Sequence, residues 1–234
     1  KTTVEKEDGG VIIRLPNSLQ FSTARISLGM PSYLLRHHSE YDLFHFNAPN
    51  PLGELSYLLT RTIRKTKVKT VCSFHGEVVS TKPFYNTYNQ WLLKSHLGAC
   101  NRVIASSPQI VKTTPLLSLF KEKVAIIPYG IDTKKFCPKQ NWSPGVPNRS
   151  LKYLFVGRLV RYKGLFVLLD AMVNSKGLLD IVGEGPLKSD LVSKVKENKL
   201  QDRVIFRDRV SDEELLQFYQ NADVVTLPSI DRGR

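Results

Sequence analysis

The sequence has few cysteines, and they do not form a recognisable pattern. Cys72, Cys100 and Cys137 are the only three among 234 residues. Their odd number and wide spacing fit neither the disulfide framework of a small secreted domain nor the paired spacing of a zinc site. We therefore expect reduced thiols, as in a cytosolic protein, and no bound metal ion.

The sequence also lacks a long apolar run. No stretch approaches the ~20 apolar residues that span a bilayer, and the polar residues 1–6 show no apolar segment of a secretory signal peptide. Hydrophobic residues make up 41% of the chain and charged residues 24%. That balance is typical of a folded globular protein rather than a disordered one, with one large domain or two small ones.

Acidic residues are scarce relative to basic ones. The net charge is +13, of which residues 1–140 contribute +10. The densest basic stretch covers residues 61–69. Such an excess suits nucleic acid, an anionic membrane surface or a phosphorylated substrate, and it equally suits a solvated surface without a partner. Nucleic acid is the least favoured partner, because basic and aromatic residues do not interleave on strands and no reader motif is present.

The second half of the chain alternates short apolar runs with segments of helical periodicity. Strands are expected at residues 151–157, 178–183, 203–206 and 222–229, and helices at 165–174, 187–198 and 215–221. Ser211 and Glu214 form the pattern of a capping box. Strands that alternate with helices predict a parallel sheet wound in the Rossmann manner.

The first half repeats this alternation less regularly. Strands are expected at residues 11–15, 41–46, 69–74, 102–105 and 124–127, and helices at 54–65 and 85–97. A further helix should follow Ser107, which is placed as an N-cap before Pro108. Residues 128–150 are rich in proline and glycine, a composition typical of a connection between domains.

The sequence therefore predicts an α/β protein of two Rossmann-like domains, with parallel sheets covered by helices on both faces. We expect the first domain over residues 1–138, a linker over 139–150 and the second domain over 151–234. The first domain is expected to lack its first strand, because the chain opens in a polar stretch. The second is expected to lack its last helices, because the chain stops just past a strand.

One turn in the second half combines two cations with two glycines. Arg158 and Lys163 follow the first strand there, and Gly157 and Gly164 bracket them. Ligands of open parallel sheets bind beyond the carboxyl ends of the strands, at helix N-termini. Two cations beside the positive end of a helix would hold a diphosphate and stabilise it as it leaves. The alternative is a pair of surface charges that share a loop by chance; the bracketing glycines favour the site.

Several motifs, taken together and in order, resemble a known family. They are residues 46–53, 73–76, 106–108, 128–132 with Phe136, 155–159 with Lys163 and Gly164, 181–187, 210–215 and 222–229. These segments resemble the family-four GT-B retaining glycosyltransferases, and those of the first half resemble bacterial enzymes of cell-surface polysaccharides. The resemblance runs from about Tyr41 to Ser229.

The resemblance implies a hexosyltransferase that moves a sugar from a nucleotide-sugar donor to a glycan or lipid-linked acceptor, with retention, in cell-envelope polysaccharide biosynthesis. It implies a cytoplasmic protein, with a possible peripheral position at the inner face of the membrane. No cofactor and no metal ion is expected, since cationic side chains and helix ends replace the metal. The sequence also contains no Asp-x-Asp.

The resemblance also assigns roles to residues. Arg158 and Lys163 match the pair that holds the donor diphosphate, and His75 matches the catalytic histidine that reaches the donor sugar. Without the resemblance, a single histidine that follows a strand and precedes a glycine is about as often structural as catalytic. The other assigned residues lie on loops expected to face the substrates: Gly157, Gly183, Glu184, Arg209 and Val210 for the donor, and Asn47 on the acceptor side. The remaining histidines show no partner spacing and are expected to be structural: His37, His38, His45 and His96.

The match to the family is incomplete. The glycine-rich acceptor-side loop and the Glu-x7-Glu helix of the family do not occur in these residues. A second interpretation is therefore a non-catalytic fragment that binds a nucleotide sugar. A third is a basic nucleic-acid-binding protein, which steeply salt-dependent binding to DNA or RNA would reveal.

Overall fold

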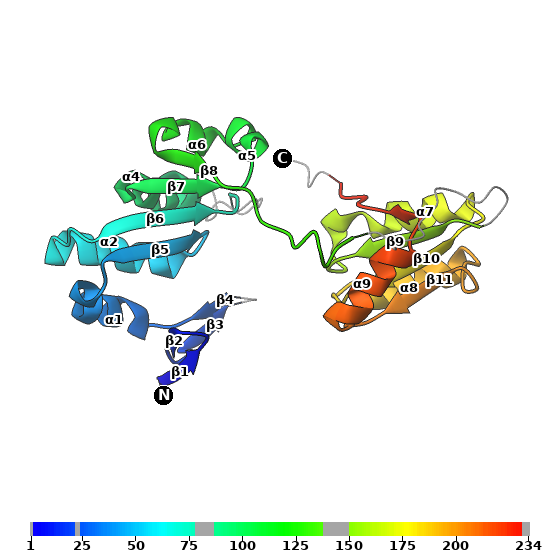
Figure 1. The fold of residues 1–234 in the computed structure, drawn as a ribbon, viewed down its shortest axis with the longest axis horizontal. Helices are drawn as coiled ribbons and strands as arrows, with labels where there is room; N and C mark the ends of the chain where they lie inside the picture. The colour runs from blue at the N-terminus through cyan, green and yellow to red at the C-terminus, as the bar shows by residue number, and fades with distance from the viewer. Residues whose placement is uncertain (1, 22–23, 78–86, 138–149, 231–234) are drawn as a thin grey trace. The chain divides into compact units, whose positions relative to one another are not determined.

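The chain folds into two compact units, Lys1–Gly130 and Ile131–Arg234. The computed structural model describes residues 2–21, 24–77, 87–137 and 150–230. Each unit contains a four-stranded sheet whose strand pairs are all parallel (Figure 1), which confirms the predicted α/β class. The predicted linker lies outside the described residues except for Ser150. Within the described part of the chain, every helix is too short or too polar to cross a bilayer.

The sheet of the first unit has the order β5-β6-β7-β8. Its strands are Leu43–Ala48 (β5), Lys69–Phe74 (β6), Arg102–Ala105 (β7) and Val124–Ile126 (β8). The helices of this unit are Gly29–His37 (α1), His38–Glu40 (η1), Pro51–Arg64 (α2), Tyr88–Leu93 (η2), Lys94–Ala99 (α4), Pro108–Thr113 (α5), Pro115–Ser118 (α6) and Lys121–Lys123 (η3). The helix predicted over 85–97 is observed as a π-helical segment, η2, followed by α4.

Strand β5 has one face in the core of the first unit and the other face outside it. Phe44, Phe46 and Ala48 are buried, whereas His45 and Asn47 between them are exposed. Successive side chains of a strand point to opposite faces. The buried face joins a core that includes Leu93 and Leu97 from η2 and α4. The other face of the same strand is therefore free to carry polar side chains.

A buried carboxyl group fixes the start of α2. Both oxygens of Glu54 accept from the hydroxyl of Tyr88, each at 2.8 Å. Glu54 also accepts from the amide of Asn50 at 2.8 Å, and Asn50 Oδ1 accepts from the amide of Gly53. Burial, followed by the neighbouring carboxyl of Glu54, raises the pKa of Tyr88, so its hydroxyl remains a donor. These bonds hold the turn after β5 against η2.

The N-terminal part of the first unit differs from the prediction. Thr3–Glu7 (β1) and Gly10–Arg14 (β2) form an antiparallel hairpin, and Leu19–Phe21 (β3) pairs with Ala24–Ile26 (β4). The strand expected at residues 11–15 therefore pairs within a hairpin rather than in a Rossmann sheet. Asp8 and Gly9 connect β1 to β2 with positive φ angles of 43° and 81°, as a two-residue Asp-Gly hairpin turn requires.

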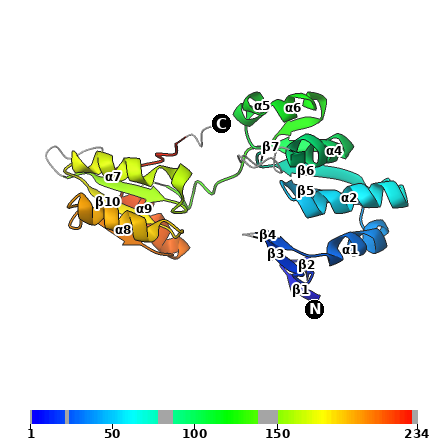
Figure 2. The same cartoon turned by 180° about the vertical axis from the view of Figure 1, so that it is seen from behind.

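The second unit has the order of the first four strands of a Rossmann fold. Its order is β11-β10-β9-β12, that is third, second, first and fourth along the chain. The strands are Lys152–Val156 (β9), Leu178–Val182 (β10), Val204–Arg207 (β11) and Val224–Val225 (β12). The helices are Arg161–Lys163 (η4), Leu165–Val173 (α7), Lys188–Glu197 (α8) and Asp212–Asn221 (α9). Helices α7 and α8 pack together on one face of the sheet, and α9 lies on the other (Figures 1 and 2).

The predicted capping box begins α9. Ser211 Oγ accepts from the amide of Glu214 at 3.2 Å, and Glu214 Oε2 accepts from the amide of Ser211 at 2.8 Å. The helix therefore starts at Asp212, before the residue 215 that we expected. The strand expected over 222–229 is shorter in the structure, where Val224–Val225 are the residues of that range that pair with β9.

The segment that precedes the predicted linker belongs to the second unit. The ring of Phe136 packs edge-on against that of Tyr219 in α9, with centroids 6.2 Å apart. Gln220 Nε2 donates to the carbonyl of Cys137 at 3.1 Å. The division between the units accordingly falls after Gly130, before the expected domain end at residue 138.

Gly164 lets two segments of the second unit meet. Its φ is +68°, and a Cβ atom built there would overlap the carbonyl oxygen of Pro228. The amide of Ile230 donates to the carbonyl of Tyr162 at 2.9 Å at the same place. The chain beyond β12 thus crosses the turn that carries Arg158 and Lys163, directly before α7.

The variant Gly164→Ala should therefore destabilise the second unit by roughly 2 kcal/mol or more, because the methyl group adds backbone strain to a steric overlap. Gly130→Ala is the matched control, since a Cβ at Gly130 meets no atom within 4 Å. Denaturant unfolding followed by circular dichroism measures both. Equal stabilities of the two variants would contradict this account of Gly164.

Candidate functional site

A pocket of about 660 Å³ lies at the carboxyl ends of β9, β10 and β11. Its lining brings together six of the seven predicted donor residues, namely Gly157, Arg158, Gly183, Glu184, Arg209 and Val210. Gly185 and Asp208 also line it, and the sequence analysis did not single them out. The pocket is the place where open parallel sheets bind their ligands.

Two loops form this pocket because their backbones bond to each other. The amide of Gly157 donates to the carbonyl of Val182 at 3.0 Å, and that of Leu159 donates to the carbonyl of Glu184 at 2.9 Å. Gly183 has a φ of +136°, and a Cβ atom there would overlap the carbonyl oxygen of Gly157. A side chain at residue 183 would push the two loops apart. Their close contact therefore requires glycine at this position.

Two arginines of the pocket lining are not paired with a carboxylate of the described residues, although Glu184 and Asp208 also line the pocket. Arg158 and Arg209 are exposed, and among the described residues no carboxylate lies within ion-pair distance of either guanidinium. Asp208 is engaged by the ammonium group of Lys188. An anion that enters the pocket would therefore meet cations free to bind it.

Lys163 does not line the pocket, unlike Arg158. It belongs to the same turn, and its Cε lies 3.9 Å from the position that a Cβ atom at Gly157 would occupy. Its ammonium group is 5.5 Å from the centre of the Tyr162 ring. Helix α7 begins directly after this turn, and its N-cap Gly164 provides no side-chain cap. The first amides of α7 therefore have no side-chain acceptor at the cap position.

His75 and Asn47 come together in the first unit. His75 follows β6, and Asn47 lies on the exposed face of the neighbouring strand β5. The ring atom Nε2 of His75 is 3.0 Å from Asn47 Oδ1, and Nδ1 is 2.5 Å from the hydroxyl of Tyr129. The amide of His75 also donates to the carbonyl of Ala48 at 2.9 Å.

These contacts select one tautomer of His75. An amide oxygen only accepts, so Nε2 carries the proton in the neutral ring and Nδ1 accepts from Tyr129. The rings of Tyr129 and His75 are nearly parallel, with an angle of 7° and centroids 6.1 Å apart. The sequence analysis gave Tyr129 no role of its own, although it lies within the motif at residues 128–132.

Two family models match the chain. The model "Glycosyltransferase Family 4" matches residues 2–135, and the model "Glycosyl transferases group 1" matches residues 138–233. Together they cover both units.

Curated relatives and solved structures agree with these matches. The chain is 28% identical over 227 residues to D-rhamnosyltransferase WbpZ of Pseudomonas aeruginosa, with 94% of this chain and 57% of that protein covered. It is 28% identical over 197 residues to O-antigen chain mannosyltransferase C of Escherichia coli, with 81% of this chain and 50% of that protein covered. The chain thus spans about half the length of these relatives.

Among solved structures, HepE of Anabaena in complex with UDP and glucose has a similar fold. The TM-score is 0.62 at 18% identity, with 90% of this chain and 59% of HepE covered. At this identity the likeness concerns the fold.

Asn47→Ala should loosen the tautomer preference of His75, because it removes the oxygen that accepts the proton of Nε2. A net hydrogen-bond contribution of about 1 kcal/mol corresponds to a roughly fivefold fall in the ratio of the Nε2–H to the Nδ1–H form. Nitrogen-15 NMR of the neutral ring measures this ratio. Tyr129→Phe is the control, since a hydroxyl can donate to Nδ1 or accept from it and therefore favours neither form. An unchanged ratio in Asn47→Ala would show that the amide oxygen does not set the tautomer.

Proposed function

Because the chain belongs to glycosyltransferase family 4, we propose that it moves a hexose-type sugar from a nucleotide-sugar donor to a glycan or lipid-linked acceptor, in bacterial cell-envelope polysaccharide synthesis. The observation that carries this proposal is the pocket at the ends of β9, β10 and β11, with the unpaired cations Arg158 and Arg209. Its volume of about 660 Å³ lies within the usual range for ligand sites.

The relatives support the proposed class of substrate. The two named above are described as a rhamnosyltransferase and as a mannosyltransferase of an O-antigen chain. HepE has been solved with UDP and with UDP-glucose. Rhamnose and mannose are both six-carbon sugars.

In the proposed arrangement, the second unit binds the donor. Arg158, Lys163 and the first amides of α7 hold the diphosphate, since these groups are cations or N–H donors at the positive end of a helix. Arg209 and Val210 contact the nucleobase, and the carboxylate of Glu184 accepts from hydroxyl groups of the nucleoside. These groups stabilise the leaving diphosphate without a metal ion. Transfer proceeds with retention.

The first unit binds the acceptor and contributes His75. Asn47 and Tyr129 hold the ring from both nitrogens, which fixes its orientation before any ligand binds. A sugar hydroxyl that binds to the ring replaces one of these partners, while the other keeps the ring oriented, so little freedom is lost. His75 thus acts at the sugar of the donor, and Asn47 positions it on the acceptor side.

Arg158→Ala and Lys163→Ala should each weaken binding of UDP by roughly tenfold or more. A charge-assisted hydrogen bond contributes about 1.5–3 kcal/mol, and each variant removes at least one. Isothermal titration calorimetry with UDP measures the affinity. Lys196→Ala is the control, because this exposed lysine of α8 does not line the pocket.

His75→Ala provides a second comparison in the same experiment. It should leave the affinity for UDP within about twofold of the parent chain, because the diphosphate site lies in the other unit. Unchanged affinity in both the Arg158 and the Lys163 variants would contradict the proposed donor site. Tight, steeply salt-dependent binding to RNA or DNA without UDP binding would favour a nucleic-acid-binding protein instead.

The basic stretch at residues 61–69 includes two arginines with structural contacts. Arg61 Nη1 donates to the carbonyl of Ala99 at 3.1 Å, and Arg64 Nε donates to the carbonyl of Leu35 at 3.2 Å. Lys65, Lys67 and Lys69 are exposed. In the proposed function these three lysines attach the first unit to an anionic membrane surface that carries the lipid-linked acceptor.

Replacing Lys65, Lys67 and Lys69 by Gln should reduce co-sedimentation with anionic vesicles, since each lysine near such a surface contributes ~1 kcal/mol. Raised salt should reduce it as well, because salt screens the charges. The control replaces three exposed lysines elsewhere in the unit, Lys94, Lys112 and Lys121, and changes the net charge equally. Equal sedimentation of the two triple variants would rule out a specific role of the stretch.

A further inference from the structure

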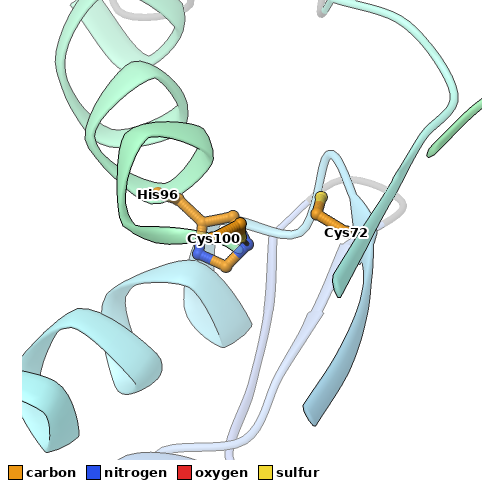
Figure 3. Close-up of side chains that lie close together, drawn as sticks. All are labelled: Cys72, His96 and Cys100. Atoms are coloured by element: carbon orange, nitrogen blue, oxygen red, sulfur yellow. Dashed lines mark hydrogen bonds between the residues drawn. The ribbon is translucent and has the colours of Figure 1, made fainter. Parts of the chain in front are cut away.

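Three side chains that bind metal ions in other proteins meet in the core of the first unit. Cys72 lies in β6, and His96 and Cys100 lie in and at the end of α4 (Figure 3). Their potential ligand atoms all lie within 4.8 Å of one another. We propose that Cys72, His96 and Cys100 form a binding site for a soft divalent cation such as Zn²⁺.

The distances suit such an ion. Cys100 Sγ and His96 Nε2 are 3.6 Å apart. With zinc bonds of about 2.3 Å to sulfur and 2.0–2.1 Å to nitrogen, the two atoms of a tetrahedral site are about 3.5 Å apart. Two sulfurs bound to one zinc ion are similarly about 3.8 Å apart. Small side-chain rotations therefore bring all three ligand atoms to bonding distance.

The imidazole of His96 is poorly satisfied by the protein alone. His96 is completely buried, with 0% exposure, and its Nδ1 has no hydrogen-bond partner among the described residues. Its other nitrogen, Nε2, lies 3.6 Å from the sulfur of Cys100, and a thiol is a weak hydrogen-bonding group. Coordination of a metal ion by Nε2 would replace this weak contact with a stronger bond.

Aromatic rings surround His96, and the three ligand atoms favour a soft ion. The rings of Phe46 and Tyr57 stand edge-on to His96, at centroid distances of 5.0 Å and 5.5 Å. Thiolate and imidazole ligands prefer zinc over hard cations such as Mg²⁺ or Ca²⁺. Two thiolates and one divalent cation are neutral together, so their burial avoids an uncompensated charge. On binding, the two thiols release their protons to solvent.

The site would be structural. Cys72 belongs to the strand that leads directly into His75, while His96 and Cys100 belong to a helix that packs against α2. An ion held by all three would tie β6 to α4. Among the described residues the group contains no fourth His, Cys, Asp or Glu ligand, so a water molecule would complete the coordination. The proposal does not depend on the proposed transfer reaction.

The test uses the reduced chain, stripped with a chelator and then titrated with Zn²⁺ or Cd²⁺ alone. Native mass spectrometry should show one ion per chain, and Cd²⁺ should produce a thiolate-to-metal charge-transfer band in the ultraviolet. Cys72→Ser and Cys100→Ser should lose the band and the bound ion. Cys137→Ser is the matched control, since this thiol is exposed and lies in the other unit, and it should keep both.

X-ray absorption at the zinc edge of the wild-type chain keeps the proposal testable if a serine variant fails to fold. It should show two sulfur ligands and a histidine nitrogen. Ion binding should also raise the midpoint of thermal unfolding of wild type and of Cys137→Ser. The proposal is overturned if the reduced wild type binds no ion, if its ligands are oxygen and nitrogen only, or if a folded Cys72→Ser variant binds as wild type does.

Discussion

The backbone contact between the loops after β9 and β10 sets the geometry of the second unit. Each loop donates or accepts hydrogen bonds that continue the sheet beyond its strands, as between Leu159 and Glu184. This approach requires that residue 183 has no side chain. Arg158 lies within one of these loops. The packing of the loop backbones, rather than a contact of its own side chain, therefore fixes its position. A cation placed this way stays available for a ligand.

The first unit positions its polar residues by different means. Parallel pairing of β5 and β6 places Asn47 opposite Ser73, two residues before His75. The hydrogen bond that His75 donates to Asn47 and its hydrogen bond with Tyr129 then orient the ring. Because the ring is exposed, these bonds compete with water and contribute little stability. They select an orientation and a tautomer, which is what a histidine needs in order to bind a particular hydroxyl group.

The sequence predicted the elements whose signals are local. Helix α9 follows from the Ser211–Glu214 box, and β6 and β7 follow from apolar runs next to turn residues. The strand β2 was expected, but its hairpin with β1 was missed because β1 is polar, although Asp8-Gly9 is a turn signal. The group of Cys72, His96 and Cys100 depends on strand-to-helix packing that no spacing reveals. The four-residue separation of His96 and Cys100 on one helix was its only local sign.

The basic residues differ in whether the protein provides partners for their charged groups. Arg61 and Lys123 both donate to carbonyl groups at the end of α4, and Arg203 donates to the carbonyl of Met172 near the end of α7. Cations at helix C-termini stabilise those helices, so part of the charge serves the fold. The guanidinium groups of Arg158 and Arg209 have neither a carbonyl nor a carboxylate partner among the described residues. Net charge therefore suggested several partners, whereas unpaired cations at one edge of the sheet, after the ends of β9 and β11, favour a phosphate ligand.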